Sequence, residues 1–339
     1  MMQFTVSDDQ AQLLEAFRRV TREEFPVARL ISRVSSPLNQ DVAKWPVISQ
    51  LGWFDLLLPE SDAAQSYGLV DQCLVHREFG QCLLTPLVLG SMLAAALATR
   101  AGAQAEAQAI VAGRIKVAPA IACERHGGRP AAGNRYYVVG LNDCDSVLIW
   151  NDAGAGLFPV SQFTDITTAQ PVEESLTLHL ATLKQAEPSL WMASPIIARQ
   201  ATLLISAQLV GAAQAALDMG VAYAKTREQF GQPIGAFQAI KHKCSDMLAR
   251  VEVAWGQVMM AALSQDADGA DAFHVSAAKV LATDAALKNA AANIQVHGGM
   301  GFTAECAAQL YLKRAHTLDL LAGPGREHHL RILASQAPV

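Results

Sequence analysis

Three glycines within four positions interrupt a helical stretch late in the chain. Residues 295 to 303 read QVHGGMGFT and follow a long, Ala-rich helical pattern. Gly298 suits a helix end, because glycine tolerates the left-handed conformation that the residue after a helix needs. That role does not require Gly299 and Gly301 as well. Two further positions without side chains indicate that something approaches the main chain closely there.

A second stretch contains residues whose types could bind a ligand. It reads YAKTREQFGQPIGAFQAIKHKCSDM and covers residues 223 to 247. We expect Arg227 to end one helix, Phe230 and Gly231 to form a turn, and Pro233 to exclude continuation before the next helix begins. From the residues alone, Arg227 is equally well read as a surface ion-pair residue. The glycines of residues 298 to 301 are equally well read as an elaborate helix cap.

Metal chemistry has no support in the sequence. The six cysteines include no CxxC pair, and the nine histidines include no HExxH motif. His328 and His329 are adjacent and therefore point to different faces of a helix. We predict no metal site, and we interpret the cysteines as small buried hydrophobic residues of a protein in a reducing compartment.

Composition and charge narrow the class of protein. The chain has 339 residues, of which 51% are hydrophobic and 17% charged, with a net charge of −5. This composition is typical of a globular protein, and the negative net charge does not favour binding to nucleic acid. The start lacks a signal peptide pattern, and Thr5 or Ser7 can cap a first helix there. Residues 201 to 224 are apolar but contain recurring polar side chains, which favours a buried bundle helix over a membrane span. We therefore expect a cytoplasmic protein with no membrane partner.

Changes in residue composition along the chain predict three domains and an α+β fold. Residues 1–114 have helical composition, residues 115–190 contain about six or seven short β-branched and aromatic runs, and residues 191–339 return to helices. The expected bundle helices cover 194–224, 236–264, 270–297 and 303–321. Long antiparallel helices commonly bury faces against copies of themselves, so an oligomer is expected.

These motifs resemble those of the acyl-CoA dehydrogenases. The family signature R-x-x-F-G-x-x-I-x-x-F-Q-x-I is matched at all seven positions, and the family landmark Q-x-x-G-G-x-G-(F/Y) is matched by residues 295 to 302. The α–β–α domain order, the SDDQ opening and the LGWFDLLLPE turn agree with the family. The seven positions of the first match are Arg227, Phe230, Gly231, Ile234, Phe237, Gln238 and Ile240.

The resemblance implies a flavin cofactor. In this family both motifs contact the ADP half of an FAD that two subunits share. A guanidinium suits a pyrophosphate, and glycine amides let a nucleotide rest on the backbone. The cofactor-binding residues that the resemblance implies are Arg227, Phe230, Ile234, Phe237, Gln238, Gln295, Val296, Gly298 and Gly299.

The catalytic half of the family site is missing from this sequence. The family base is a glutamate shortly after an arginine on the last long helix, where this chain has Leu321, Ala322 or Gly323. None of these residues accepts a proton. The first bundle helix, which carries the base in some members, has no carboxylate in the stretch IARQATLLISAQLVG. Glu327 comes too late in the chain and is expected on the following helix, so we predict no catalytic residue.

The β region also departs from the family pattern. The segments T-E-P-x-A-G-S and W-I-T-N, which seat the flavin ring in the family, have no counterpart. The sequence APAIACERHGG stands where the first would be, and the domain is shortened. Glu124 aligns only loosely with the family, and we interpret it as an exposed carboxylate at a strand end.

These matches and departures predict a division of labour between two subunits. The chain resembles the smaller, glutamate-lacking subunit of bacterial α2β2 acyl-CoA dehydrogenases of steroid side-chain breakdown. This implies a non-catalytic subunit that lends the ADP-binding half of the FAD site to a paralogous catalytic partner acting on an acyl-CoA. Two alternatives stay open: a self-sufficient homotetramer with a displaced base, and a non-enzymatic scaffold of the same fold.

Overall fold

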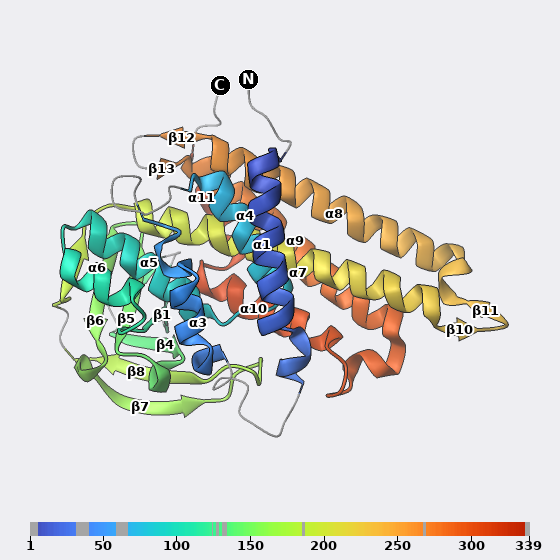
Figure 1. The fold of residues 1–339 in the computed structure, drawn as a ribbon, viewed down its shortest axis with the longest axis horizontal. Coiled ribbons are helices and arrows are strands. Elements are labelled where there is room, and N and C mark those ends of the chain that lie inside the picture. The colour runs from blue at the N-terminus through green and yellow to red at the C-terminus, as the bar shows by residue number, and fades with distance from the viewer. Residues whose placement is uncertain are drawn as a thin grey trace.

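The computed structural model describes most of the chain. The described residues are 6–31, 41–58, 67–123, 125–126, 129–130, 134–184, 187–266 and 269–335. Glu124 and Thr5 fall outside these ranges. Within them the chain forms N-terminal helices, a central sheet and a bundle of long helices, which is the fold class that the sequence predicts (Figure 1).

The N-terminal part consists of short helices around an aromatic core. The first helix is capped by Ser7, whose hydroxyl accepts from the Gln10 amide at 3.2 Å while the Gln10 side chain accepts from the Ser7 amide. This capping box confirms Ser7 as the N-cap. The helices are α1 (Asp8–Glu24), η1 (Val27–Leu30), α3 (Trp45–Gln50), η2 (Trp53–Asp55), α4 (Leu69–Gln81), α5 (Pro86–Arg100) and α6 (Gln104–Val111).

The central sheet has seven strands in the order β7-β8-β4-β1-β5-β6-β9. Only β1 and β5 pair in parallel, and every other neighbour is antiparallel. The sheet runs from Val117 to Met192, so its last strand extends two residues past the expected boundary. The strands are β1 (Val117–Ala122), β4 (Arg135–Val139), β5 (Ser146–Asn151), β6 (Gly154–Pro159), β7 (Phe163–Ala169), β8 (Leu178–Leu183) and β9 (Leu190–Met192).

Several short elements lie outside the main sheet and the long helices. Two 3-10 turns flank β5 and β6, and the described residues also form three two-stranded hairpins, one in the β region and two between the bundle helices. These elements are η3 (Leu141–Asp143), η4 (Val160–Gln162), β2 (Arg125–His126), β3 (Arg129–Pro130), β10 (Glu228–Gln229), β11 (Gln232–Pro233), β12 (Gln265–Asp266) and β13 (Gly269–Ala270).

The C-terminal bundle matches its predicted helices closely except at the last long one. This helix begins at residue 308 rather than 303, because residues 298–302 form a 3-10 turn before it. A further helix follows, and it carries Glu327. The elements are α7 (Ile196–Thr226), η5 (Ile234–Ala236), α8 (Gln238–Leu263), α9 (Ala272–His297), η6 (Gly298–Phe302), α10 (Ala308–Leu321) and α11 (Gly325–Ala334).

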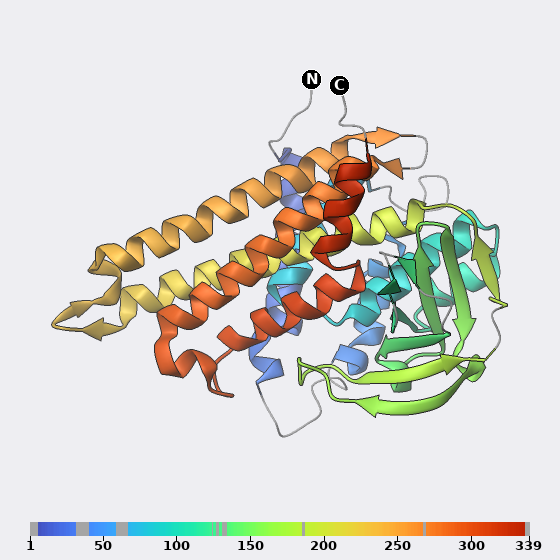
Figure 2. The same cartoon turned by 180° about the vertical axis from the view of Figure 1, so that it is seen from behind.

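Helix α7 is the central core helix. Its length and apolar composition would allow it to cross a membrane, but 89% of its most apolar window is buried inside the protein. Helices α4, α8 and α9 pack around it (Figures 1 and 2). Burial by the surrounding helices accounts for the apolar run at 201–224, in agreement with the bundle-helix interpretation.

Two glycines let α4 and α7 cross in close contact. A Cβ atom on Gly80 would lie 1.9 Å from the Gln208 carbonyl oxygen, and one on Gly211 would lie 1.9 Å from the Arg77 carbonyl oxygen. His76 is fully buried in the same contact, where the Gln208 amide lies 3.0 Å from its Nδ1. Its Nε2 atom has no hydrogen-bond partner among the described residues. Burial therefore lowers the pKa of His76 to about 3.

This burial makes folding sensitive to acid. The unfolded chain binds a proton at His76 near pH 6.5, whereas the folded chain does not until about pH 3. The contribution of neutral His76 to the free energy of unfolding is therefore fully present above pH 6.5. It is lost as the pH falls from 6.5 towards 3. We expect the free energy of unfolding of the wild type, minus that of His76→Gln, to drop by about 1.4 kcal/mol per pH unit between pH 6 and 4. Urea denaturation measures it, and parallel pH curves for the two proteins would contradict it.

The three parts of the chain meet at one buried turn, residues 81–85 between α4 and α5. Arg314 of α10 places its guanidinium against Glu173 of the β7–β8 loop at 2.6 and 2.7 Å, and both side chains are 2% exposed or less. The same guanidinium donates to the Leu84 carbonyl at 2.6 Å. Arg29 pairs with Asp41 and donates to the carbonyls of Cys82 and Leu83. The 81–85 turn is thereby bonded to helical elements from both ends of the chain, and through Glu173 to the sheet.

We expect this turn to depend on complete pairing. Arg314→Met leaves the Glu173 carboxylate buried and uncompensated, which costs about 3–5 kcal/mol in the free energy of unfolding. Adding Glu173→Gln should recover a large part of that loss. The control Arg331→Met removes an exposed pair with Asp152 and should cost under about 1 kcal/mol. Equal losses for Arg314→Met and Arg331→Met in urea denaturation would refute this role.

Candidate functional site

The two sequence motifs lie together at one end of the helical bundle. Helices α7 and α9 run in the same direction and end side by side, with α8 antiparallel between them in the chain. The β10–β11 hairpin projects beyond α7, and η6 follows α9 (Figure 2). The structure therefore joins the arginine segment and the glycine turn into one surface.

Close contacts between α7 and α9 hold this surface together. The rings of Tyr223 and His297 stack with their centroids 4.2 Å apart and their planes at 23°. One turn earlier, a Cβ on Gly220 would come within 3.3 Å of the Asn293 side-chain oxygen. The hairpin returns to α7 as well, since the Ile234 amide donates to the Arg227 carbonyl at 2.8 Å.

The three glycines of the turn differ in their backbone conformation and surroundings. Gly298 ends α9, as expected, but its φ of +63° and ψ of −143° lie outside the left-handed helical region that the sequence suggested. Gly301 is buried, and a Cβ there would lie 2.6 Å from the Ile294 carbonyl oxygen, so its close neighbour is the chain's own helix rather than a ligand. For Gly299, no atom lies within 4 Å of an added Cβ. Only Gly298 and Gly299 present bare main chain to open space.

The hairpin displays an aromatic ring at a conformational cost. Phe230 and Gly231 both have positive φ, at +54° and +79°, which is a two-residue turn of the type that favours Asn-Gly. A phenylalanine rarely adopts this conformation. This residue is nevertheless 92% exposed, and its ring meets that of Phe237 edge-on at 6.1 Å between centroids. Strain of this kind at an exposed ring indicates a functional position.

The remaining predicted cofactor residues fall into three groups by exposure. Arg227, Gln238, Gln295, Gly298 and Gly299 are exposed, and Ile234 and Phe237 are half-buried. Val296 is buried, so its side chain faces the bundle core and only its main chain is available to a ligand. The Gln238 amide lies 3.2 Å from Nε2 of His242, one turn further along α8.

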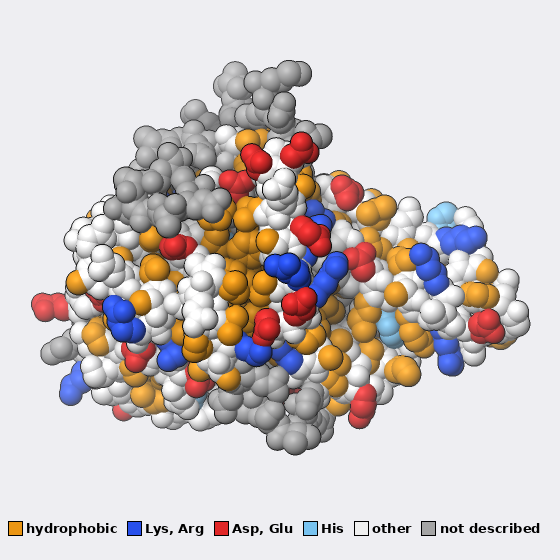
Figure 3. Space-filling view, viewed as in Figure 1, with side chains coloured by type: hydrophobic (Ala, Val, Ile, Leu, Met, Phe, Trp, Pro, Cys, Tyr) orange, Lys and Arg blue, Asp and Glu red, His pale blue; other side chains and the backbone are white. Residues whose placement is uncertain are grey.

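The charges at this end suit an anionic ligand. Lys225 and Arg227 flank the end of α7, and Lys241 and Lys243 lie in the first turns of α8. Figure 3 shows Lys and Arg side chains over this end of the bundle. The two helix C-termini are the negative ends of their dipoles, so these cations supply the attraction for a phosphate. Exposed cations, bare glycine main chain and exposed rings fit the diphosphate and base of a dinucleotide.

The resemblance places the family base at one of three residues near the end of α10. Leu321, Ala322 and Gly323 are all buried at the end of α10. The carboxylate of Asp319, one turn earlier, accepts from Lys279 Nζ at 2.5 Å and from Thr283 Oγ1 at 3.0 Å. Lys279 itself is fully buried, so this carboxylate is held as a structural ion pair.

Glu327 lies beyond that position. It is half-buried in the first turn of α11, and its amide donates to the Pro324 carbonyl at 2.8 Å. The expectation that this residue belongs to the following helix is thus met. Its role stays a prediction, as does the absence of a catalytic residue in this chain.

Sequence reasoning missed the residues that organise the surroundings. Glu173 was part of an unremarkable loop, PVEESLT, and its pairing with Arg314 has no local signal because the two residues are far apart in the chain. The stacking of Tyr223 on His297 was equally hidden. Tyr223 and His297 lie within the two stretches that the sequence analysis identified, whereas nothing in the sequence singled out Glu173.

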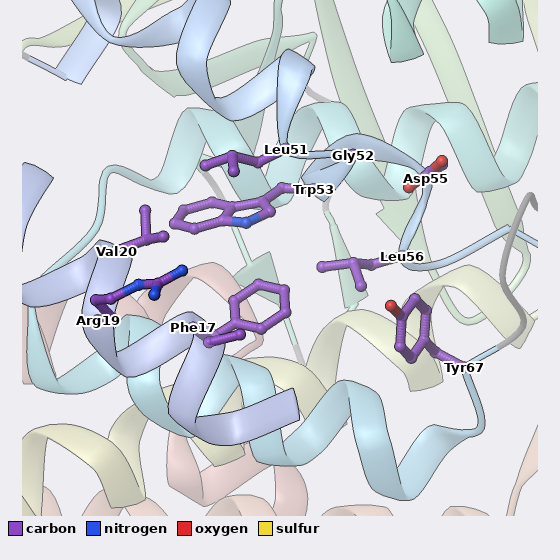
Figure 4. A pocket seen from close by; sticks show the side chains of 10 residues that line it. Phe17, Arg19, Val20, Leu51, Gly52, Trp53, Asp55, Leu56 and Tyr67 are labelled. Atoms are coloured by element: carbon purple, nitrogen blue, oxygen red, sulfur yellow. The ribbon is translucent and has the colours of Figure 1, made fainter. Parts of the chain in front are cut away.

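A pocket elsewhere in the protein is separate from this surface. It has a volume of about 290 Å³ and lies between α1 and the α3–η2 segment (Figure 4). Phe17, Trp53 and Leu56 form its apolar wall, and Arg19 and Asp55 lie at its edges. These residues belong to the N-terminal helices, so the pocket is not part of the surface formed by the two motifs.

Comparisons with known proteins establish the family. Residues 199–337 match the family description "Acyl-CoA dehydrogenase, C-terminal domain". The chain is 31% identical over 323 residues to Acyl-CoA dehydrogenase IpdE2 of Mycobacterium tuberculosis, covering 94% of this chain and 95% of that protein. The chain therefore belongs to the acyl-CoA dehydrogenase family.

Solved structures agree with this assignment in their fold. The ChsE4-ChsE5 complex from Mycobacterium tuberculosis matches with a TM-score of 0.79 at 21% identity, covering 99% of this chain and 100% of that chain. A glutaryl-CoA dehydrogenase from Mycobacterium smegmatis in complex with FADH2 matches with a TM-score of 0.79 at 17% identity, covering 96% and 94%. These likenesses show that the chain has the same fold.

We expect Phe230→Asn to stabilise the isolated fold. Asparagine tolerates positive φ, and the exposed phenylalanine ring buries almost nothing in this chain, so the free energy of unfolding should rise by about 0.5–1 kcal/mol. Thermal unfolding measures the change. Phe302→Asn serves as a control, because that ring is also largely exposed, at 74%, but has ordinary backbone angles and should leave stability unchanged. A loss of stability in Phe230→Asn would show that the ring supports the fold.

Proposed function

We propose that this chain is the non-catalytic subunit of a heteromeric, FAD-dependent acyl-CoA dehydrogenase. The observation that carries the proposal is the contrast between the two halves of the family site. One end of the bundle presents the residues for a nucleotide, whereas the position of the family base is filled by buried Leu321, Ala322 and Gly323. Such a chain contributes binding and leaves the proton transfer to a partner.

The nucleotide half consists of this chain's own residues. Arg227 lies at the base of the hairpin, with its guanidinium available to two phosphate oxygens at once. The main chain of Gly298 and Gly299 faces open space, so a nucleotide approaches it without meeting a side chain. Phe230 and Gln238 add an exposed ring and an amide to the same surface. When bound, the flavin supplies the hydride acceptor of the reaction.

The proton-transfer half is assigned to the partner. Removing the α-proton of an acyl thioester needs a free carboxylate within hydrogen-bond reach of that proton. Asp319 does not meet this requirement, because Lys279 and Thr283 hold it. We infer that a paralogous subunit supplies the glutamate and most of the contacts to the flavin ring, in an α2β2 heterotetramer.

One comparison lends support to this partnership. One structure with the same fold is the ChsE4-ChsE5 complex, which is named for two components. The substrate is an acyl-CoA that undergoes α,β-desaturation, and we propose a steroid side-chain CoA by analogy with the α2β2 enzymes that this chain resembles. If each pair of subunits has one active site instead of two, the space of the lost site is available to a large ring system.

The role of Arg227 tests the proposal. Arg227→Ala removes a charge-assisted contact to the pyrophosphate, so FAD retention by the complex should weaken by about 1.5–3 kcal/mol, roughly 10- to 150-fold in Kd. The flavin-to-protein ratio after dialysis and a fluorescence titration measure this. Lys288→Ala is the matched control, because it removes an exposed cation from the middle of α9 that pairs only with Asp284.

Two outcomes decide the matter. Loss of flavin in Arg227→Ala with full retention in Lys288→Ala supports the proposal. Equal flavin contents in the wild type and Arg227→Ala complexes would show that this surface holds no cofactor.

A further inference from the structure

We propose that Tyr223 and His297 are positioning residues of the nucleotide site. Their ring stack sets the separation between the Arg227 hairpin and the glycine turn, and thereby the affinity for the ADP moiety. This inference rests on the proposed function. It assigns a role to two side chains whose identity neither family signature specifies.

The first link joins Tyr223 to Arg227. The Arg227 amide donates to the Tyr223 carbonyl at 2.9 Å, which closes the last turn of α7. Arg227 itself is extended, with φ −78° and ψ 121°, and begins the hairpin. The direction in which the arginine leaves the helix is therefore fixed by the residue whose ring stacks on His297.

The second link joins His297 to the glycine turn. His297 is the last residue of α9, and Gly298 follows it directly. Its Nδ1 lies 2.9 Å from the Asn293 carbonyl oxygen, and because a carbonyl only accepts, Nδ1 carries the proton. With 7% of its surface exposed, the ring is held in one orientation. A fixed ring at this point fixes where the bare main chain of the turn begins.

The stack is the contact between these two links. The centroids are 4.2 Å apart at 23°, which is a close offset-stacked geometry. The tight approach of Gly220 to Asn293 one turn earlier brings the helices close enough for the rings to meet. A side chain without a ring at position 223 would leave both motifs intact but would loosen their spacing. Small displacements of binding groups are costly, because a bidentate contact demands its geometry.

The test compares two substitutions at one position. Tyr223→Phe keeps the ring, and Tyr223→Leu removes it while staying apolar. In the flavin-free complex of this chain with its partner subunit, calorimetric titration with ADP should give a Kd within about twofold of wild type for Tyr223→Phe. For Tyr223→Leu the Kd should rise roughly three- to tenfold. Phe273→Leu is the matched control, because Phe273 contacts His274 by its ring edge at the opposite end of α9.

A double-mutant cycle separates positioning from general loosening. If the stack acts through Arg227, then Arg227→Ala should raise the Kd for ADP less in the Tyr223→Leu background than in the wild type. The two increases in Kd should differ by about threefold. Additive effects, or an unchanged Kd for Tyr223→Leu, would overturn the inference while Arg227 still binds ADP. If the wild-type complex does not bind ADP, or if Arg227→Ala leaves its Kd unchanged, the proposed function itself fails.

Discussion

The architecture depends on two buried guanidinium–carboxylate pairs that surround one turn. Residues 81–85 offer four successive carbonyls to side chains from other parts of the chain, and the Thr85 amide donates to Asp41 at 3.1 Å. Buried charges of this kind are costly unless every partner is in place, so they specify an arrangement more than they add stability. The donors to the four carbonyls are Tyr311 for Gln81, Arg29 for Cys82 and Leu83, and Arg314 for Leu84.

This arrangement leaves the far end of the bundle free to carry the site. The sheet lies near the start of α7 and the 81–85 turn near its middle, where Leu83 clusters with Ala212 and Ala216. The hairpin and the glycine turn lie at the other end of α7 (Figures 1 and 2). The site is built on the ends of two long helices, which hold binding groups more rigidly than loops do. Its exposed rings, Phe230 and Phe302, are the kind of surface that is completed by a ligand or by another subunit.

Much of the fold could be predicted because it follows local patterns. The long helices of the bundle were predicted to within a few residues from apolar periodicity, and Ser7 was one of the two residues predicted to cap the first helix. The onset of α10 was wrong by five residues, because Gly301 folds η6 back onto the end of α9 and delays the helix. The two-residue hairpins and β9 are too short to leave a periodic signal.

The candidate site could be predicted only in part. Arg227 and the glycines were found through a resemblance, since a guanidinium and a bare backbone suit surface and binding roles alike. The close approach to the main chain that the sequence indicated at Gly301 comes from the Ile294 carbonyl of the chain's own helix. Contacts between distant residues, such as Glu173 with Arg314 and Tyr223 with His297, depend on the folded chain and leave no local pattern.

The central claim is that this chain completes a flavin site without catalysing the reaction alone. Its most direct test is anaerobic addition of an acyl-CoA to the purified chain and to the chain co-expressed with its paralogous partner, followed by the flavin absorbance. The account predicts a yellow heterotetramer whose flavin is bleached by the acyl-CoA, and a colourless or insoluble product when the chain is expressed alone. A soluble, yellow homo-oligomer of this chain whose flavin is bleached by acyl-CoA would contradict it.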